Sequence, residues 1–359
     1  MLTGATRLSV IAALAVVPLS FLVVLFHAPA LAIFICSSLS LMPLAGILSS
    51  ATDQISLWRG PAIGGLLNAT FGNATELIFS LVALHQGQLE LVRASLIGSV
   101  IGNILLVLGL SALLGGLKHR VLKFNSEAAQ AHATMMALSA IALLVPALFV
   151  WNKQGAAGGL SADKALHLSF GVALVLLVVY VGGLVFSLRT HESLFRAVSD
   201  NPEEPTWKQW SAALVLAGAT AVIAVESNFL VGSLHAAVHS LGLSPVFVGL
   251  IIIPIVGNAA EHGAAILMAL ADRMDVSLSI AVSSSTQIAM FVIPLLVFFS
   301  IPLGHPMSIL FTPFELIALT VSVLIATVIS SDGKSHWLEG AQLVAVYVVL
   351  ALSFYYVGT

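Results

Sequence analysis

Charged residues are scarce in this sequence, and it has a single cysteine. Asp, Glu, Lys and Arg make up 8% of the 359 residues, against about 25% in ordinary soluble domains. With 59% hydrophobic residues as well, the composition excludes an ordinary water-soluble domain. A lone Cys36 cannot form an intrachain disulfide, and a formal net charge of −3 is too small to suggest a nucleic-acid partner.

Recognisable catalytic motifs are also missing. The sequence has no HExxH zinc motif, no glycine-rich nucleotide-binding loop and no pattern of a nucleophilic triad. We therefore predict that the protein is not an enzyme and that it has no cofactor.

Long apolar runs dominate the sequence instead. A helix needs about 20 apolar residues to cross a bilayer, and these runs lack the alternation of membrane barrel strands. We predict an all-α integral membrane protein with about eleven spans, since a helix satisfies its own backbone polar groups in lipid. The predicted spans are Leu8–Phe26, Pro29–Ser49, Pro61–Leu84, Leu91–Gly115, Ala128–Val150, Leu166–Leu188, Trp210–Leu230, Pro245–Leu270, Leu278–Phe299, Ile309–Ser330 and Leu338–Tyr356.

The positions of Lys and Arg predict the orientation of these spans. Loops on the cytoplasmic side of membrane proteins carry an excess of both residues. With the N-terminus inside, only Arg93, Lys153 and Lys164 fall outside, and an odd number of spans places the C-terminus outside. We expect the first segment to be a retained helix rather than a cleaved signal, because its apolar run exceeds the roughly 7–15 residues of a signal core. The short N-terminal tail favours a prokaryotic cytoplasmic membrane.

One short motif occurs twice. Residues Gly72–Glu76 (GNATE) recur as Gly257–Glu261 (GNAAE), each in the middle of an apolar run. In the predicted topology the two spans run in opposite directions, as an inverted repeat requires, so that their centres can meet near the midplane. We divide the chain accordingly into a first helix, a five-helix repeat, an acidic cytoplasmic linker and a second, inverted five-helix repeat, at residues 1–28, 29–188, 189–208 and 209–359.

Glu76 and Glu261 are the centre of the predicted site. A carboxylate at bilayer depth costs about 3 kcal/mol and is by default a functional group. Glycine and Pro254 weaken the helices around both motifs, so we expect broken helices whose backbone lines a cavity. Each half of the site would then offer a carboxylate, the side-chain oxygen of Asn73 or Asn258, and free backbone carbonyls.

Such a set of oxygen ligands suits a hard cation. Ca²⁺ takes roughly 6–8 oxygens in flexible geometry, and two carboxylates neutralise one divalent ion. Once the cation leaves, two facing carboxylates in an apolar cavity cannot both stay ionised, so protons are the natural counter-ion. The structural alternative is that both glutamates only join helices through hydrogen bonds.

Polar side chains on neighbouring spans extend this hypothesis. Ser99 and Asn103 share one helix face in the span after the first motif, and Ser284 and Gln287 share a face in the equivalent later span. They could be packing residues between membrane helices or further ligands for cations and protons. His262 has no counterpart in the first motif; it could pass protons, sense acidity or only hydrogen-bond the neighbouring carboxylate.

At this point a family resemblance becomes specific. Residues 66–76 and 254–262 resemble the two α-repeats of the cation/proton exchanger family, the Ca²⁺/H⁺ branch of the calcium:cation antiporter superfamily. Further similar segments are MPLA at 42–45, ASLIGS at 94–99, SSTQI at 284–288 and DGKSH at 332–336. The resemblance implies that Ca²⁺, and often Mn²⁺ or other divalent cations, is exchanged for H⁺ by alternating access. It also implies that Glu76 and Glu261 are the central ligands, surrounded by Asn73, Asn258, Ser99, Ser284 and Gln287.

The seventh predicted span departs from the family pattern. Asn228 and His235 stand where family members often carry acidic residues, and Glu226 lies two positions before Asn228. These departures bear on pH dependence and ion preference more than on the basic function. Glu315 matches a family position but lies at a predicted helix start, where a capping role is expected.

We therefore predict an antiporter that expels cytosolic Ca²⁺ in exchange for protons within a lipid bilayer. The alternatives are a Na⁺/Ca²⁺ exchanger of the same architecture and a passive cation channel. The sodium branch tends to carry Ser-x-Pro-Glu or Ser-x-Pro-Asp where this sequence has Asn-Ala-Thr-Glu, which favours protons as the coupling ion. The sequence leaves a homo-oligomer open.

Overall fold

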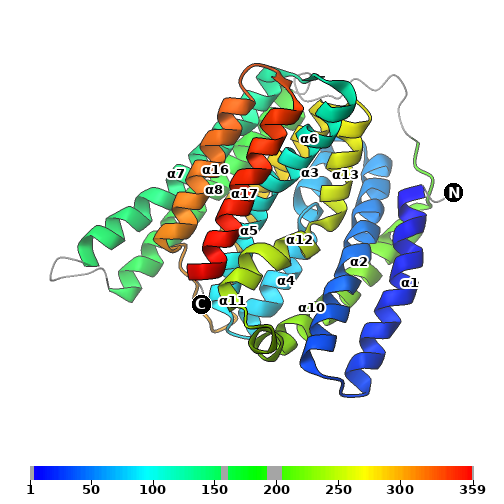
Figure 1. Ribbon diagram of the computed structural model, residues 1–359, viewed down its shortest axis with the longest axis vertical. Coiled ribbons are helices and arrows are strands. Elements are labelled where there is room, and N and C mark those ends of the chain that lie inside the picture. The colour runs from blue at the N-terminus through cyan, green and yellow to red at the C-terminus, as the bar shows by residue number, and fades with distance from the viewer. Residues whose placement is uncertain (1–3, 155–160, 192–203, 358–359) are drawn as a thin grey trace. The chain divides into compact units, whose positions relative to one another are not determined.

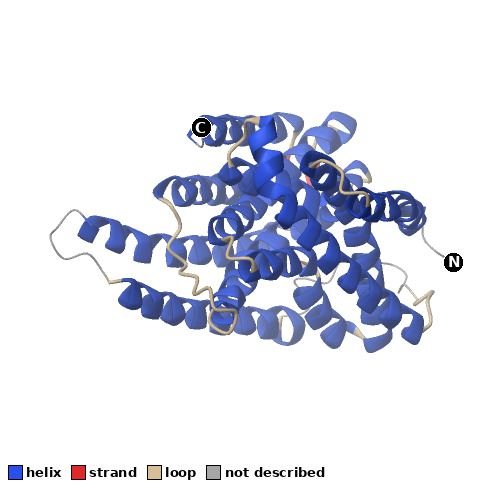
Figure 2. Ribbon diagram, turned by 90° about the horizontal axis from the view of Figure 1, so that it is seen from below, coloured by secondary structure: helices blue, strands red, loops and turns tan. Residues whose placement is uncertain are grey.

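The computed structural model describes residues 4–154, 161–191 and 204–357, and these residues are almost entirely helical (Figure 2). The first half contains α1 (Gly4–Leu25), α2 (Ala30–Arg59), α3 (Pro61–Phe71), α4 (Ala74–His85), α5 (Leu89–Ile101), η1 (Gly102–Val107), α6 (Leu108–His119), β1 (Leu122–Lys123), α7 (Ser126–Gln154), α8 (Ala162–Val185) and η2 (Phe186–Thr190). The second half contains α10 (Gln209–Leu241), α11 (Pro245–Phe247), η3 (Val248–Ile252), α12 (Ile253–Gly257), α13 (Ala259–Leu270), α14 (Met274–Gln287), η4 (Ile288–Val292), α15 (Ile293–Ser300), α16 (Pro313–Ile329), β2 (Lys334–Ser335) and α17 (Trp337–Val357). Elements labelled η are π-helical.

The lengths and composition of the helices confirm the predicted membrane class. Within the described ranges, eight helices are long and apolar enough to cross a bilayer, or nine if the bent pair Pro245–Gly257 and Ala259–Leu270 is one span. Large apolar side chains such as Leu14 and Val328 are highly exposed, as expected of surfaces that face lipid. Two shorter apolar helices, Ala74–His85 and Pro313–Ile329, lie in two other predicted spans, and the count of eleven stays a prediction.

Several helices differ in extent from the predicted spans. Helix α2 continues to Arg59, ten residues beyond the predicted end at Ser49. Helix α10 continues to Leu241, eleven residues beyond the predicted end, and ends at Gly242, whose left-handed conformation (φ 65°) terminates it. Helix α16 starts only at Pro313, where Thr312 and Glu315 form a reciprocal capping box: the Thr312 backbone N–H donates to Glu315 Oε2 at 2.8 Å, and the Glu315 N–H donates to Thr312 Oγ1 at 3.3 Å. The expected capping role of Glu315 is thereby confirmed.

The described residues form two compact units, each drawn from both halves of the sequence. One unit comprises residues 4–95, 204–261 and 354–357, and the other comprises residues 96–154, 161–191 and 262–353. In the first unit α2 packs along both α1 and α10 (Figure 1). The buried face of α2 is rich in small residues, among them Ser37, Ser40 and Ala45, which let membrane helices approach closely.

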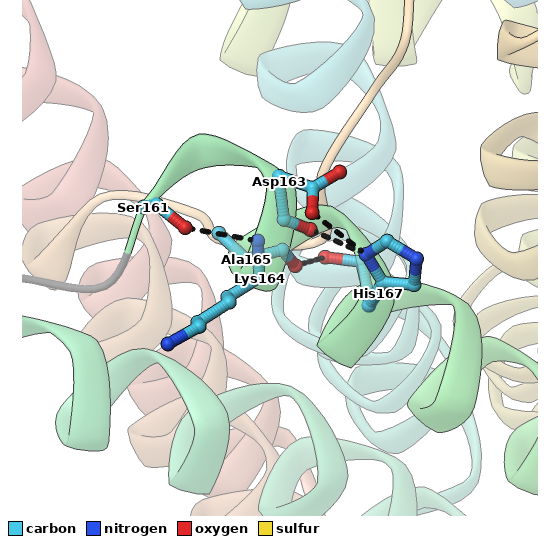
Figure 3. A network of polar contacts seen from close by, with 6 residues as sticks. Ser161, Asp163, Lys164, Ala165 and His167 are labelled. Carbon is cyan, nitrogen blue, oxygen red and sulfur yellow. Dashed lines mark hydrogen bonds and ion pairs between the residues drawn. The ribbon is translucent and has the colours of Figure 1, made fainter.

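In the second unit, α7 packs against α14 and α16, and α8 packs against α15. A two-stranded antiparallel pair, with Leu122 opposite Ser335 and Lys123 opposite Lys334, joins two loops of this unit. Helix α8 begins at a capped turn (Figure 3): the Lys164 N–H donates to Ser161 Oγ at 3.4 Å. His167 Nδ1 lies 2.8 Å from the Asp163 carbonyl oxygen, so local helix capping accounts for these exposed polar residues.

Helices α6 and α17 of the second unit approach each other at Gly340. A Cβ added to Gly340 would lie 2.1 Å from the Leu113 amide nitrogen and 2.5 Å from the Gly109 carbonyl oxygen. Both are backbone atoms and cannot turn away as a flexible side chain could, so only glycine permits this contact.

We expect Gly340→Ala to destabilise the protein by about 1–3 kcal/mol, the usual cost of overpacking. Gly182→Ala on α8 is the matched control, because nothing lies within 4 Å of the added atom there. Thermal unfolding of both variants in detergent measures the difference. Equal midpoints of thermal unfolding for the two variants would show that α6 and α17 can move apart to accept the methyl group without loss of stability.

Candidate functional site: two broken helices with buried carboxylates

The first motif breaks a helix and places a carboxylate just after the break. Helix α3 ends at Phe71 and α4 starts at Ala74, with Asn73 as its N-cap residue at φ −107° and ψ 31°. Glu76 lies in the first turn of α4. The exposed fraction of Asn73 is 2% and that of Glu76 is 8%, so both side chains are enclosed by protein.

The second motif repeats this arrangement. Helix α12 ends at Gly257 and α13 starts at Ala259, and the helices on the two sides of the break are inclined by 61°. Asn258 is 1% exposed, and its Nδ2 donates to the Pro254 carbonyl at 3.0 Å. Glu261 lies in the first turn of α13. The broken helices predicted at both motifs are present.

Each carboxylate therefore lies at a helix N-terminus. The first N–H groups of a helix have no partner within it, and the aligned peptide dipoles place partial positive charge there. Both breaks therefore present free N–H groups and partial positive charge close to the buried carboxyl groups of Glu76 and Glu261. Broken membrane helices that present their ends to a charged substrate are a recurring feature of secondary transporters.

The first carboxylate reaches the second motif. A Cβ added to Gly257 would lie 3.1 Å from Oε1 of Glu76, so the carboxylate rests against the backbone of the second break. Within the described part of the chain this buried oxygen has no hydrogen-bond partner. From the sequence, Gly257 is predicted only to weaken its helix. The structure shows that a side chain at this position would also crowd the carboxylate of Glu76.

The other predicted site residues belong to the second unit, where three of them form one network. Asn103 Nδ2 donates to Ser284 Oγ at 3.0 Å, and Asn103 Oδ1 lies 3.2 Å from His262 Nε2. Because Oδ1 can only accept, His262 Nε2 carries the hydrogen of this bond. Ser99 is buried and Gln287 partly buried in the same unit. Whether these residues bind a cation stays a prediction.

Sequence reasoning missed the π-helical turns beside these residues. Asn103 is the second residue of η1, and Gln287 directly precedes η4. A π-turn inserted into an α-helix changes the direction of the side chains that follow it, and such turns are frequent at functional sites. The apolar residues of η1 and η4 carry no signal that separates a π-turn from an α-turn.

The residues that replace family acids on α10 contact the loop after α4. Gln86 Nε2 donates to Asn228 Oδ1 at 2.9 Å, and His235 Nε2 lies 3.2 Å from Gln88 Oε1. Amide and imidazole groups thus tie α10 to the end of α4 in the first unit.

Comparison with known proteins identifies the family of this chain. The family model described as "Sodium/calcium exchanger protein" matches residues 29–189 and 211–356, which is most of the chain. The chain belongs to this family. It is 43% identical to the Ca(2+)/H(+) antiporter of Aphanothece halophytica over 357 residues, which covers 95% of this chain and 94% of that relative. It is also 43% identical to the Ca(2+)/H(+) antiporter ChaA of Bacillus subtilis over 344 residues, covering 94% and 96%.

Solved structures show the same fold. The structure of native YfkE superimposes with a TM-score of 0.83 at 40% identity, covering 97% of this chain and 99% of that chain. The H+/Ca2+ exchanger CAX superimposes with a TM-score of 0.74 at 14% identity, covering 99% and 93%, and at that identity the match concerns the fold alone. The resemblance to the Ca²⁺/H⁺ branch of the calcium:cation antiporter superfamily is thereby confirmed.

Proposed function

We propose that this protein is a secondary active antiporter that expels Ca²⁺ from the cytosol in exchange for protons by alternating access. The observation that carries the proposal is the meeting of the two motifs, in which the buried Glu76 carboxylate lies against Gly257 at the second helix break. The two relatives named above as Ca(2+)/H(+) antiporters, each 43% identical to this chain, support the same function. Other divalent cations with similar ligand preferences are candidate substrates.

In this proposal Glu76 and Glu261 bind the cation, and Asn73 and Asn258 add neutral oxygens. Two carboxylates balance the charge of one divalent ion, so the occupied site is neutral. When the cation leaves outward, two close carboxylates in an apolar site repel each other, and external protons neutralise them. Ca²⁺ and protons therefore compete for the same groups, which is the physical basis of exchange. The membrane potential contributes only if more than two protons enter per Ca²⁺.

The helix breaks supply the moving parts of the cycle. Backbone at Gly72 and Asn258 lies outside regular helix, so the half-helices on either side can shift with little loss of hydrogen bonding. Asn103, Ser284 and His262 would hold the adjoining helices in register through their hydrogen bonds. Ser99 and Gln287 complete the predicted ligand set. Ca²⁺ and H⁺ are cargo in this scheme, and no resident cofactor is required.

We infer that the N-terminus is cytoplasmic, that the C-terminus is external, and that the protein lies in a prokaryotic cytoplasmic membrane. The excess of Lys and Arg supports the choice of the cytoplasmic side. Contacts within each unit support the arrangement of the spans, since each contact joins two segments that the predicted topology places on the same side. Contacts on the predicted cytoplasmic side are Trp58 with Trp207, Lys118 with Leu270, and Lys123 with Lys334; those on the predicted outer side are Gln88 with His235 and Ser169 with Ile309. Most of the acidic linker, at 192–203, lies outside the described residues.

Flux measurements in proteoliposomes test which ion is coupled to Ca²⁺. We expect a pH gradient to drive ⁴⁵Ca²⁺ accumulation and a sodium gradient of equal size to have no effect. A protonophore should abolish the accumulation, and protein-free liposomes are the control. Dependence on sodium without dependence on pH would identify a Na⁺/Ca²⁺ exchanger instead. Ca²⁺ currents that need no counter-ion would identify a channel.

A further inference from the structure

Glu226 is a buried carboxyl group of the first unit that the proposed exchange does not use. It lies near the middle of the 33-residue helix α10, and its exposed fraction is 0%. Asn228, two residues later, hydrogen-bonds Gln86 just beyond α4. Because two residues are about 200° apart around an α-helix, Glu226 faces away from that contact. Its neighbours are α1 and α2 instead.

Three serine hydroxyls surround this carboxyl group. Ser20 of α1 forms a short hydrogen bond with Oε1 of Glu226, and Ser37 and Ser40 of α2 face the same group. All three serines are fully buried. Helix α1 otherwise presents mostly apolar side chains to lipid, so Ser20 and Glu226 form an isolated polar contact between two membrane helices.

The number of hydroxyl hydrogens available for hydrogen bonds indicates whether the Glu226 carboxyl group is protonated. Ser20 Oγ lies 2.8 Å from the Val17 carbonyl oxygen and also contacts Glu226 Oε1, but a hydroxyl has one hydrogen and can satisfy only one of these acceptors. Ser40 donates its hydrogen to the Val16 carbonyl at 3.2 Å. Within the described part of the chain, Glu226 Oε2 has no hydrogen-bond partner. Of the three hydroxyls only that of Ser37, which has no other partner among the described residues, is left to donate to a carboxylate anion. A carboxylic acid needs fewer donors and supplies the missing hydrogen to Ser20 Oγ.

Among the described residues, no basic side chain lies at the level of Glu226 on the side of α10 that faces α1 and α2. His85 of α4 adjoins Gln86, which contacts Asn228 on the opposite side of α10. The titratable and charged residues on the elements packed against Glu226, and on α10 itself, are Arg7 on α1, Cys36, Asp53 and Arg59 on α2, Glu76 and His85 on α4, and His235 and His239 on α10. Arg7 and Arg59 lie 13 or more residues along their helices from Ser20 and Ser40, about 20 Å at 1.5 Å per residue. His235 is more than two turns beyond Glu226. An anion would therefore be buried without a counter-ion, which is strongly unfavourable in a membrane.

We propose that Glu226 is a second proton-binding site of this protein, a neutral carboxylic acid that donates its hydrogen to Ser20 and joins α10 to α1 and α2. Its dissociation breaks the O–H bond, leaves the electron pair on the carboxylate and passes the proton to water. The resulting anion would have neither counter-ion nor enough donors, so α10 would lose its polar contact with α1 and keep only apolar contacts such as that of Phe229 with Phe21. The packing of these helices thereby depends on pH. This site does not rest on the proposed exchange, because its protonation can be read without transport.

Infrared difference spectroscopy of the full-length protein in nanodiscs at neutral pH tests the proposal directly. The probe is the C=O stretching band of a protonated carboxylic acid, compared between wild type and Glu226→Gln, and again in a Glu76→Gln/Glu261→Gln background. We expect one such band, sensitive to D₂O, to disappear with Glu226→Gln in both backgrounds. Ser20→Ala should shift the band and leave it present. An unchanged band region would show that Glu226 is ionised. Loss of the wild-type band on adding Na⁺ at constant ionic strength would show that the carboxyl group binds a monovalent cation instead.

The pH dependence of thermal unfolding gives a second, independent readout. A group that keeps its proton in the folded protein and loses it in the unfolded chain makes the folded state less stable as pH rises. The wild-type midpoint should therefore fall from about pH 5, where a glutamate of the unfolded chain has lost its proton, up through neutral pH more steeply than that of Glu226→Gln. Ser233→Ala on the same helix, where the hydroxyl bonds only its own backbone at 2.8 Å, should follow the wild type. Parallel curves for wild type and Glu226→Gln would overturn the proposal.

Discussion

Replacing either Glu76 or Glu261 by glutamine is expected to abolish proton-driven Ca²⁺ transport. Glutamine has nearly the same size and keeps one oxygen ligand, but it removes the negative charge and the proton-binding group. Removing one charge from a buried, paired set costs about 2–5 kcal/mol, which is at least about a 30-fold loss of Ca²⁺ affinity. The coupling is lost as well, since only one carboxylate remains for protons. Initial rates of ⁴⁵Ca²⁺ uptake into proteoliposomes measure the effect.

Glu90→Gln is the matched control for these two variants. Glu90 lies in the first turn of α5 and is exposed, so the same chemical change occurs outside the buried site. This variant should transport at the wild-type rate, and all three should elute from size-exclusion chromatography as wild type does. Substantial transport by Glu76→Gln or Glu261→Gln would remove that residue from the site.

Gly257→Ala is expected to impair transport strongly while leaving the fold intact. The added methyl would lie 3.1 Å from Glu76 Oε1, closer than carbon and oxygen normally approach. The carboxylate is the end of a flexible side chain, so it can move aside and folding is preserved. That movement displaces the proposed ligand, and displacements of about 1 Å in a reacting or binding geometry can reduce rates about 100-fold.

Gly263→Ala controls for the change in helix propensity, which amounts to about 1 kcal/mol in favour of alanine. Gly263 lies on α13, just after Glu261, and nothing lies within 4 Å of a Cβ added there. Calcium affinity and uptake rate should therefore be lowered in Gly257→Ala and remain at the wild-type level in Gly263→Ala. If Gly263→Ala impaired transport as much as Gly257→Ala, the loss would reflect helix stiffness rather than contact with Glu76.

The membrane class and the two helix breaks were predictable from local sequence. Long apolar runs leave helices as the form that satisfies backbone groups in lipid, and the eight long apolar helices of the described residues agree with this. The breaks follow from Gly72, Gly257 and Pro254, which weaken helices through their own backbone chemistry. Such effects act over a few residues, so one motif of five residues was enough to locate each break.

Contacts between distant segments were not predictable in the same way. The sequence indicates Asn103 only as a candidate ligand beside Ser99, but the structure joins its amide to Ser284 and His262, which are more than 150 residues away. Glu226 was noted only as an acid displaced from a family position, and the structure turns it toward Ser20 of α1. Apolar membrane helices give weak indications of which face meets which neighbour, because lipid and protein interior are both apolar.

The sequence by itself determined that the chain is helical and embedded in lipid, that it carries two copies of one acidic motif, and that both copies interrupt their helices. These properties depend on composition and on the backbone preferences of a few residues, which act locally. Only the tertiary structure decided that Glu76 lies against Gly257, that α2 packs between α1 and α10, and that π-turns accompany the polar residues of the second unit. These features depend on close packing between segments far apart in the chain, where the size and direction of individual side chains select one arrangement among many of similar hydrophobicity.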